Sequence, residues 1–334
     1  MKIILDAMSG DNAPKAQVIG GLTAAEKLGV DIILCGNKDI IEKEMASYKG
    51  DTSRITVHHC SEVIENEDDP IRSVRRKPDS SITVGLGLLN EGKADAFISS
   101  GNTGAVIVGS MQILGVIDGI SRPALMPVIP TAKGPCALLD SGANAVCTPE
   151  NLCHFAIMGS YYMNKVMGIQ NPRVGLINIG AEEKKGTPLT KEAYKMLKEM
   201  PINFTGNIEA RHIPAGDADV IIADGFTGNI VLKLYEGMGK FLLTKFKDIL
   251  MTNIKTKLAA LLIKGEVGAF KKSMDYKEHG GAPLLGVNKT VIKAHGSSDA
   301  KAVVSAVRQA MKAVESNLTE EIKNCVKSSE VEPH

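Results

Sequence analysis

The sequence predicts an α/β protein of three layers, in which helices cover both faces of a large, mostly parallel sheet. Two observations lead to this fold class. Short apolar runs typical of buried parallel strands alternate with longer segments that have helical spacing. Glycine-containing turns lead from several strands directly into the next helix, as in βαβ units. The 334 residues can bury a large core, and we expect residues 1–334 to form one domain with two lobes.

The amino-terminal part shows the alternation most clearly. Strands are expected at Lys2–Leu5, Asp31–Cys35 and Ile55–His58, with helices at Ala16–Leu28 and Asp39–Tyr48 between them. A helical crossover allows the strands that it joins to lie parallel. The later helices are expected at 69–77, 80–90, 105–117, 150–166, 190–200 and 300–325. The later strands are expected at 95–100, 138–140, 174–179, 204–208, 220–224 and 291–295, with a proline-rich crossing at 123–135, a turn-rich loop at 279–286 and a frayed tail at 327–334.

The stretch Val220–Lys233 is the centre of the predicted site. Its apolar run is typical of a buried strand ending at Asp224, after which Gly225 and Gly228 let the backbone turn and a helix follows from Ile230. A strand that leads through such a turn to a helix N-terminus offers free backbone N–H groups to an anion. The alternative is a tight βα connection in which Asp224 only caps the helix.

Three other segments repeat this pattern of a strand end with glycine and an Asp or Asn side chain. They are Asp95–Ala105, Leu138–Asn144 and Val174–Gly180, the last followed by the charged loop 181–187. Ligands of open α/β sheets bind outside the carboxyl ends of the strands, so we expect these loops to converge on one crevice. None of them matches the dinucleotide or Walker patterns, so no nucleotide site is predicted.

Composition and charge exclude several classes of function. A net charge of +1, 4% aromatic residues and the lack of Trp argue against a nucleic-acid binder. The six cysteines show no C-x-x-C spacing, which is typical of reduced thiols in a cytoplasmic protein, and no signal peptide precedes Met1. Cys147, Cys153 and His154 have no fourth ligand nearby, so we expect neither a metal nor a cofactor.

Two segments raise the question of a membrane. Ala96–Ile117 has no charged residue, but polar residues in its first half leave an apolar run too short to span a bilayer. Residues 241–272 form an amphipathic segment, which we expect to project for dimer or membrane contact. Its apolar face is expected to hold Ile254, Leu258, Leu261 and Leu262, beside a lysine-rich polar side. This face fits a partner subunit, an anionic membrane surface or ordinary core packing.

A strongly basic helical turn lies at Arg72–Lys77. It contains Arg72, Arg75, Arg76 and Lys77, and Pro78 stops the helix. A solvated charged face is one interpretation. The other is a docking patch for an acidic protein or a phosphate-bearing cofactor.

The polar side chains expected in the crevice indicate what chemistry it supports. They are Asp6, Asn102, Asn144, Lys184, Lys185, Asp224, Asn229 and His295, together with the amides of the glycine turns. The sequence contains no G-x-S-x-G elbow, and no cysteine lies in an obvious strand-to-helix elbow. These features favour a reaction whose nucleophile comes with the substrate, while the enzyme binds an anion, orients it and stabilises an oxyanion.

Six motifs together resemble the phosphate acyltransferases of bacterial phospholipid synthesis, the PlsX family. The motifs are 6–14 (DAMSGDNAP), 74–77 (VRRK), 99–104 (SSGNTG), 184–186 (KKG), 224–229 (DGFTGN) and 293–299 (KAHGSSD). The resemblance covers nearly the whole chain in the right order. Ser9 departs from it, because the family usually has a second glycine at that position.

The resemblance implies an activity and a set of partners. An acyl group would pass from acyl carrier protein to inorganic phosphate, and a downstream glycerol-3-phosphate acyltransferase would consume the acyl phosphate. It also implies a fold like phosphotransacetylase and the isocitrate and isopropylmalate dehydrogenases. It implies as well that the protein is a homodimer. The protein would be cytoplasmic and peripherally associated with an anionic membrane surface.

The site residues are assigned on the same basis. We expect Lys184 to be the main electrostatic catalyst, with Asn229 and Asp224 orienting the phosphate or the acyl carbonyl; Lys185 is the alternative lysine. The basic turn 72–77 becomes a candidate dock for the acidic carrier protein. The residues expected to bind substrate are Asp6, Gly10, Asn102, Thr103, Gly104, Asn144, Lys185, Gly225, Gly228, His295, Gly296 and Ser297.

Three other functions remain open. A phosphotransacetylase-like enzyme would use coenzyme A as the acyl carrier. A nicotinamide-dependent dehydrogenase would need metal-binding aspartates and a cofactor loop, which the sequence does not show. A membrane-binding scaffold without catalysis would bind liposomes even when every crevice residue is lost.

Overall fold

The computed structural model describes residues 1–273 and 280–330, and it shows an α/β fold with two sheets. The first sheet has the strand order β3-β2-β1-β4-β12-β11-β5, and the second has the order β6-β7-β10-β8-β9. The strands of the first sheet are β1 (Lys2–Asp6), β2 (Asp31–Gly36), β3 (Ile55–His59), β4 (Ala96–Ser99), β5 (Ala124–Leu125), β11 (Ala282–Leu285) and β12 (Thr290–Lys293). Those of the second are β6 (Val128–Thr131), β7 (Gly134–Leu139), β8 (Val174–Asn178), β9 (Phe204–Glu209) and β10 (Val220–Ile222).

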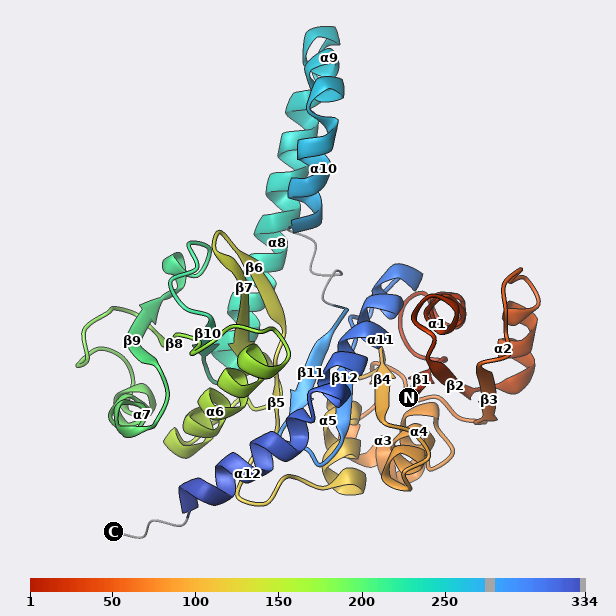
Figure 1. Cartoon of the computed structure of the whole chain (residues 1–334), viewed down its shortest axis with the longest axis horizontal. Helices are drawn as coiled ribbons and strands as arrows, with labels where there is room; N and C mark the ends of the chain where they lie inside the picture. Colours follow the sequence, from red (N-terminus) through yellow and green to blue (C-terminus); the bar gives the residue numbers. More distant parts are fainter. Residues whose placement is uncertain (274–279, 331–334) are drawn as a thin grey trace.

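Most strand pairs are parallel, and helices cover both faces of each sheet (Figure 1). The first sheet packs against α1 (Lys15–Leu28), α2 (Lys38–Met45) and α11 (Ala300–Glu315) on one face, and against α3 (Pro70–Arg76), α4 (Ser81–Asn90) and α5 (Thr103–Gly109) on the other. The second packs against α6 (Pro149–Lys165), α7 (Pro188–Glu199) and α12 (Leu318–Glu330) on one face, and against α8 (Gly225–Leu250) on the other. The predicted fold class is confirmed, with the sheet divided in two.

The chain crosses between the sheets at Met126 and Pro127. The Met126 N–H donates to the carbonyl of Pro283 in β11, whereas the carbonyl of Pro127 accepts from Leu138 in β7. The predicted proline-rich crossing therefore contains strand as well. The strands in this crossing are β5, β6 and the start of β7, whose apolar residues are buried.

Four predicted elements differ from the structure. Residues 282–285 are strand β11 rather than loop, because they pair antiparallel with β5 and β12. The last predicted helix is two, α11 and α12, since Asn317 adopts a left-handed conformation (φ 52°) and turns the chain toward α6. Helix α8 begins at Gly225, not Ile230. Helix α12 continues to Glu330, so residues 327–330 of the predicted frayed tail are helical. His279 and residues 331–334 of that tail lie outside the described residues.

Helix α8, α9 (Ile254–Leu262) and α10 (Lys264–Ser273) form a hairpin that protrudes from the body of the molecule (Figure 1). The 26 residues of α8 make it about 39 Å long. Within the described chain, no helix has both the length and the apolar character needed to cross a bilayer.

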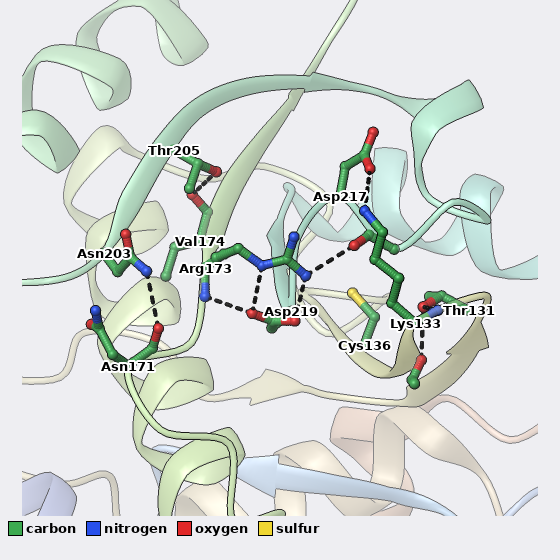
Figure 2. Close-up of polar contacts among 12 residues, drawn as sticks. Thr131, Lys133, Cys136, Asn171, Arg173, Val174, Asn203, Thr205, Asp217 and Asp219 are labelled. Atoms are coloured by element: carbon green, nitrogen blue, oxygen red, sulfur yellow. Dashed lines mark hydrogen bonds and ion pairs between the residues drawn. The ribbon is translucent and has the colours of Figure 1, made fainter.

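An ion pair orders the amino ends of β8 and β10 in the second sheet (Figure 2). The Arg173 guanidinium donates two hydrogen bonds to the Asp219 carboxylate, of 3.0 and 2.8 Å, and a third to the Gly216 carbonyl. The backbone N–H of Arg173 also donates to Asp219, at 2.8 Å. This cluster lies at the strand edge opposite to the loops predicted to bind substrate.

Candidate active site

A cavity of about 1680 Å³ lies at the carboxyl ends of the strands. Its polar wall includes Thr103 after β4, Ser141 after β7, Asn229 in α8, and Lys293 and His295 at the end of β12. The hairpin helices supply a long apolar wall, with Leu243, Phe246, Leu250 and Val267 among its residues. The cavity therefore joins loops from both sheets to an apolar surface.

Asp6 is one of the predicted residues that the fold buries. Its side chain is 1% exposed and accepts hydrogen bonds from the Ser99 hydroxyl at 2.6 Å and from the Met8 N–H at 3.2 Å. The Ser99 oxygen in turn accepts from the Gly101 N–H at 3.0 Å. Asp6 thus holds the loops after β1 and β4 in place, without itself lining the cavity.

The loop after β12 is shaped by His295. Its Nδ1 lies 3.1 Å from the Ser297 nitrogen and 2.9 Å from the Ser297 hydroxyl, while its carbonyl accepts from the Ser298 hydroxyl at 2.7 Å. Burial lowers the pKa of His295; the nearby Glu236 acts against this change, whereas Lys233 and Lys293 add to it. The imidazole therefore favours its neutral form inside the cavity.

The loops after β1 and β12 touch each other closely. Asp11 donates its backbone N–H to the Gly296 carbonyl at 2.8 Å. Gly10 has φ of 106°, and a Cβ there would lie 3.0 Å from the same carbonyl. Gly10 is thus required for the contact, whereas Gly296 and Ser297 themselves face the cavity.

Asn102 caps α5 and fixes the segment before α3. Its side-chain oxygen accepts from the Ala105 N–H, and its amide donates to the carbonyls of Glu65, Asn66 and Asp68, each at 3.1 Å. These bonds use its donor and acceptor groups within the protein. The neighbouring Thr103 is exposed and lines the cavity, whereas Gly104 packs against Pro70, so close that a Cβ would lie 2.5 Å from it.

The start of α8 is pressed against the loop after β7. A Cβ on Gly228 would lie 1.9 Å from the Asp140 carbonyl oxygen, and one on Gly225 would lie 2.6 Å from the Asn144 carbonyl oxygen. Neither glycine has a positive φ. The expectation that they serve a sharp turn is therefore wrong: they are needed for a close approach between a helix and a loop.

Asp140 is the centre of this contact. Its fully buried carboxylate accepts four hydrogen bonds, from the N–H groups of Leu125, Ala143 and Asn144 and from the Asn144 side chain. Burial raises the pKa of Asp140, although these bonds act in the opposite direction. The Asn144 amide also donates to the Pro123 carbonyl at 2.7 Å, so Asn144 ties the loop together.

Asp224 and Asn229 occupy the first turn of α8. The Asp224 carboxylate caps the helix, accepting from the N–H and the hydroxyl of Thr227 at 2.9 and 2.8 Å. Asn229 is exposed and lines the cavity opposite Gly142. The structure thus places Asn229, rather than Asp224, in the cavity wall.

Lys184 and Lys185 lie in the loop between β8 and α7. Both side chains are exposed, and neither lies among the described residues that line the cavity. Because β8 pairs with β10, their loop follows the strand next to the one that ends before Asp224. The two lysines are therefore at the correct edge of the sheet but outside the cavity wall, and their catalytic role stays a prediction.

Lys293, Lys233 and Glu236 also line the cavity and were not predicted. Lys233 and Glu236 form an ion pair of 2.9 Å on α8. Burial lowers the pKa of Lys293 to about 8, with the nearby Asp6 acting against this change. A signal for Lys293 was present, since it ends a strand at the start of a family motif. The sequence did not show that its side chain is enclosed.

The basic turn places three arginines on the surface. Arg72, Arg75 and Arg76 are exposed and form no ion pair with other described residues. Lys77 differs, because it pairs with Asp68 at 2.6 Å and donates to the Val63 carbonyl at 2.8 Å. Three of the four predicted docking residues are thus available to a partner.

The apolar face predicted in the hairpin is exposed. Ile254, Leu258, Leu261 and Leu262 are between 59% and 85% exposed, which excludes core packing within one copy of this chain. Along α8 the exposed apolar stripe continues through Phe226, Ile230, Leu234, Met238, Phe241, Leu242 and Ile249. No cluster of three or more His, Cys, Asp or Glu suited to a metal occurs among the residues described.

Solved structures of similar fold include phosphotransacetylases. One from Streptococcus pyogenes superimposes with a TM-score of 0.63 at 17% identity, covering 95% of this chain and 94% of that one. The EutD phosphotransacetylase of Staphylococcus aureus gives a TM-score of 0.60 at 16% identity, with the same coverage. At these identities the likeness shows the fold alone.

Sequence comparison gives the family. The model of the family described as fatty acid synthesis protein matches residues 1–321. The phosphate acyltransferase of Alkaliphilus oremlandii is 54% identical over 328 residues, covering 98% of both chains. That of Clostridioides difficile is 48% identical over 323 residues, covering 96% of this chain and 95% of the other. The chain therefore belongs to the fatty acid synthesis protein family, the PlsX family of phosphate acyltransferases that its motifs indicate, and is an acyltransferase of lipid synthesis.

Proposed function

We propose that the protein transfers a fatty acyl group from acyl-acyl-carrier-protein to inorganic phosphate. A phosphate oxygen attacks the thioester carbonyl carbon, the carbon–sulfur bond breaks, and the thiolate leaves with the proton of hydrogen phosphate. The products are an acyl phosphate and the free thiol of the carrier protein. Phosphate is already an anion at neutral pH, so no strong base is needed to activate it.

The observation that carries this proposal is the two-part wall of the cavity. Its polar part holds Lys293, His295, Asn229 and backbone groups of glycine-containing loops, which suit phosphate and a thioester carbonyl. Its other part is formed by apolar residues of the hairpin, which suit an acyl chain. Phosphate and a fatty thioester need both kinds of surface next to each other.

Lys184 is proposed to offset the negative charge that develops on the thioester oxygen, approaching from its exposed loop. Asn229 is proposed to orient the substrate from the cavity wall, and Asp224 to hold the first turn of α8 that carries it. Lys184→Ala should reduce phosphate-dependent thiol release by about 100-fold and leave the melting temperature unchanged. Normal turnover in this variant would show that another cation has this role. Lys185→Ala is the matched comparison.

The carrier protein is proposed to dock on the surface formed by Arg72, Arg75 and Arg76. Carrier proteins are acidic, and an unpaired basic surface speeds their encounter through electrostatic attraction that salt screens. Replacing the three arginines by glutamine should raise KM for the acyl carrier protein and flatten its dependence on salt. The KM for phosphate should not change.

The exposed hairpin is proposed to serve a second copy of the chain and an anionic membrane surface. The apolar stripe on α8 fits a homodimer, because such a stripe on one long helix needs an equally long partner. The α9 face, with Lys255 and Lys257 beside it, fits a membrane surface. An acyl phosphate released there would reach the glycerol-3-phosphate acyltransferase proposed to consume it.

One assay tests the reaction. Purified protein is mixed with long-chain acyl carrier protein and phosphate, and free thiol and hydroxylamine-trappable acyl phosphate are measured. Both should appear in equal amounts and only when phosphate is present. Thiol release without acyl phosphate would indicate hydrolysis and would contradict the proposal.

The second candidate is the phosphotransacetylase-like enzyme that the sequence left open, which would use coenzyme A as the acyl carrier. Acyl-coenzyme A and acyl carrier protein with the same acyl chain separate the two functions. We expect kcat/KM to be higher with the carrier protein, because coenzyme A offers no acidic protein surface to the basic turn. A clear preference for coenzyme A would reverse the assignment.

A further inference from the structure

Three polar residues form a row across neighbouring strands at the carboxyl edge of the first sheet. Lys293, the last residue of β12, is in register with Ser99, the last residue of β4. Paired residues of adjacent parallel strands direct their side chains to the same face. Ser99 in turn donates its hydroxyl hydrogen to Asp6, the last residue of β1. The sheet itself therefore sets the place of Lys293.

Lys293 has hydrogen-bonding capacity that the protein does not use. Its ammonium group donates to the Ala294 carbonyl at 2.5 Å, and no other described residue accepts a hydrogen bond from it or pairs with it. An ammonium group has three N–H donors, so two remain for a ligand. Asp6 acts on Lys293 electrostatically, but the two side chains form no ion pair.

Lys293 is also partly enclosed, which makes its charge unfavourable without a counter-ion. The side chain is partly buried and lines the cavity, where removal from water without a counter-ion is unfavourable. The charged groups that act on this part of the cavity are Asp6 of β1, Asp11 before α1, Lys233 and Glu236 of α8, and His295. Lys233 is already paired with Glu236, so Lys293 is the cation here that lacks a bonded carboxylate among the described residues.

We infer that Lys293 is the cation that binds the phosphate substrate in the cavity, with Asp6 and Ser99 as its positioning residues. The inference rests on the proposed function and assigns one step of it. Bound phosphate accepts the two free N–H donors of Lys293, which places the attacking oxygen beside the polar wall. Lys184 then acts on the thioester and does not anchor the phosphate.

Phosphate binding by Lys293 should depend on pH. A lysine with a pKa of about 8 is about nine-tenths charged at pH 7 and about one-tenth charged at pH 9. The KM for phosphate of the wild-type protein should therefore rise about tenfold for each pH unit above about 8.

The test uses Lys293→Met, Lys293→Arg and the control Lys289→Met, which alters an exposed lysine just before the amino end of the same strand. Lys293→Met should raise KM for phosphate by about 10- to 100-fold, the value of a charge-assisted hydrogen bond. Its KM for acyl carrier protein should stay within about twofold. Lys289→Met should leave both constants unchanged.

Lys293→Arg provides a measurement that does not depend on the methionine variant. Arginine keeps its charge at all accessible pH values, so KM for phosphate should become independent of pH between about pH 7.5 and about pH 9.5. A pH dependence like that of the wild type would overturn the inference. An unchanged KM for phosphate in Lys293→Met would overturn it as well.

Folding is monitored by thermal denaturation of each variant. Because burial lowers the pKa of Lys293, its charge destabilises the folded state below about pH 8, and this effect disappears as pH rises toward 10.5. Lys293→Met should therefore melt at pH 7 no lower than the wild type. If the wild type forms no acyl phosphate at all, the proposed function fails, which is a different result from an active enzyme with an unaffected variant.

Discussion

The amino and carboxyl edges of the strands both hold charged groups, which differ in whether a partner within the protein compensates their charge. At the amino edge of the second sheet, Arg173 and Asp219 satisfy each other with several hydrogen bonds. Burial would raise the pKa of Asp219, but the bonds from Arg173 outweigh it and the pKa is lowered, while the pKa of Arg173 is raised. Lys293, in the cavity, has its pKa shifted away from the charged form.

The direction of the pKa shift distinguishes two uses of charge in this protein. In the pair Arg173–Asp219 the fold favours both charged states, so the pair contributes to stability. At Lys293 the fold holds a charge that it does not fully compensate, which is typical of a group that awaits a ligand. Mutations at the two edges should therefore affect different quantities.

The largest effect is expected at Gly228, a position at the carboxyl edge that serves stability. Gly228 lies at the carboxyl edge, yet a Cβ there would come within 1.9 Å of the Asp140 carbonyl oxygen, which is a backbone atom and not the end of a flexible side chain. Gly228→Ala should lower the free energy of unfolding by about 3 kcal/mol or more and reduce activity with it. Urea denaturation and the phosphate-transfer assay measure both.

Gly237→Ala is the matched control on the same helix. No atom lies within 4 Å of the position that its Cβ would take. This change should stabilise the protein by up to about 1 kcal/mol, because alanine favours a helix over glycine. Equal destabilisation by the two alanines would show that helix α8 responds to any substitution and not to the contact with Asp140.

The next effect is expected at the amino edge. Arg173→Met leaves Asp219, whose side chain is 18% exposed, without its partner, and should lower the free energy of unfolding by about 2 kcal/mol. The kcat and both KM values should stay within about twofold of the wild type. Urea denaturation and steady-state kinetics are the measurements.

The exposed pair Lys195–Glu192 gives the control for this change. Its side chains are 67% and 55% exposed, so Lys195→Met should change stability by less than about 0.5 kcal/mol. A loss of phosphate binding in Arg173→Met would contradict the separation of the two edges, because it would give a structural pair a role at the site.

The smallest effect is expected in the acid range. Since the pKa of Asp219 is lowered from its ordinary value of 3.8, the stabilisation by the pair is complete above that value. It is lost as pH falls through the lower pKa of the folded state. Arg173→Met should therefore lose less stability between about pH 5 and about pH 2 than the wild type. Parallel acid-unfolding curves would contradict the assignment.

Much of this fold follows from local sequence. The strand and helix alternation of residues 1–90 is confirmed within a few residues. Three of the four helices there begin at a capping side chain, since Asn37, Asp69 and Ser80 each accept a backbone hydrogen bond. Loops at the carboxyl ends of parallel strands were predicted to meet, and Thr103, Asn229 and His295 do line one cavity.

Other features depend on what packs against a segment. Residues 282–285 have the glycines and proline of a turn, yet they become a strand because β5 and β12 lie on either side. Gly228 follows a strand as a turn glycine would, but what it meets is the Asp140 carbonyl, 88 residues before it. Local propensity cannot report on such partners, because they are distant in the chain.

The sequence by itself determined the fold class, the family and which loops carry polar side chains, since these depend on residue type, spacing and order. Only the tertiary structure decided which lysine is enclosed. Lys184 and Lys293 both follow or end a buried strand, and nothing local separates them. Lys184 is exposed, whereas Lys293 is partly buried in the cavity that α8 helps to line, and this removal from water lowers the pKa of Lys293.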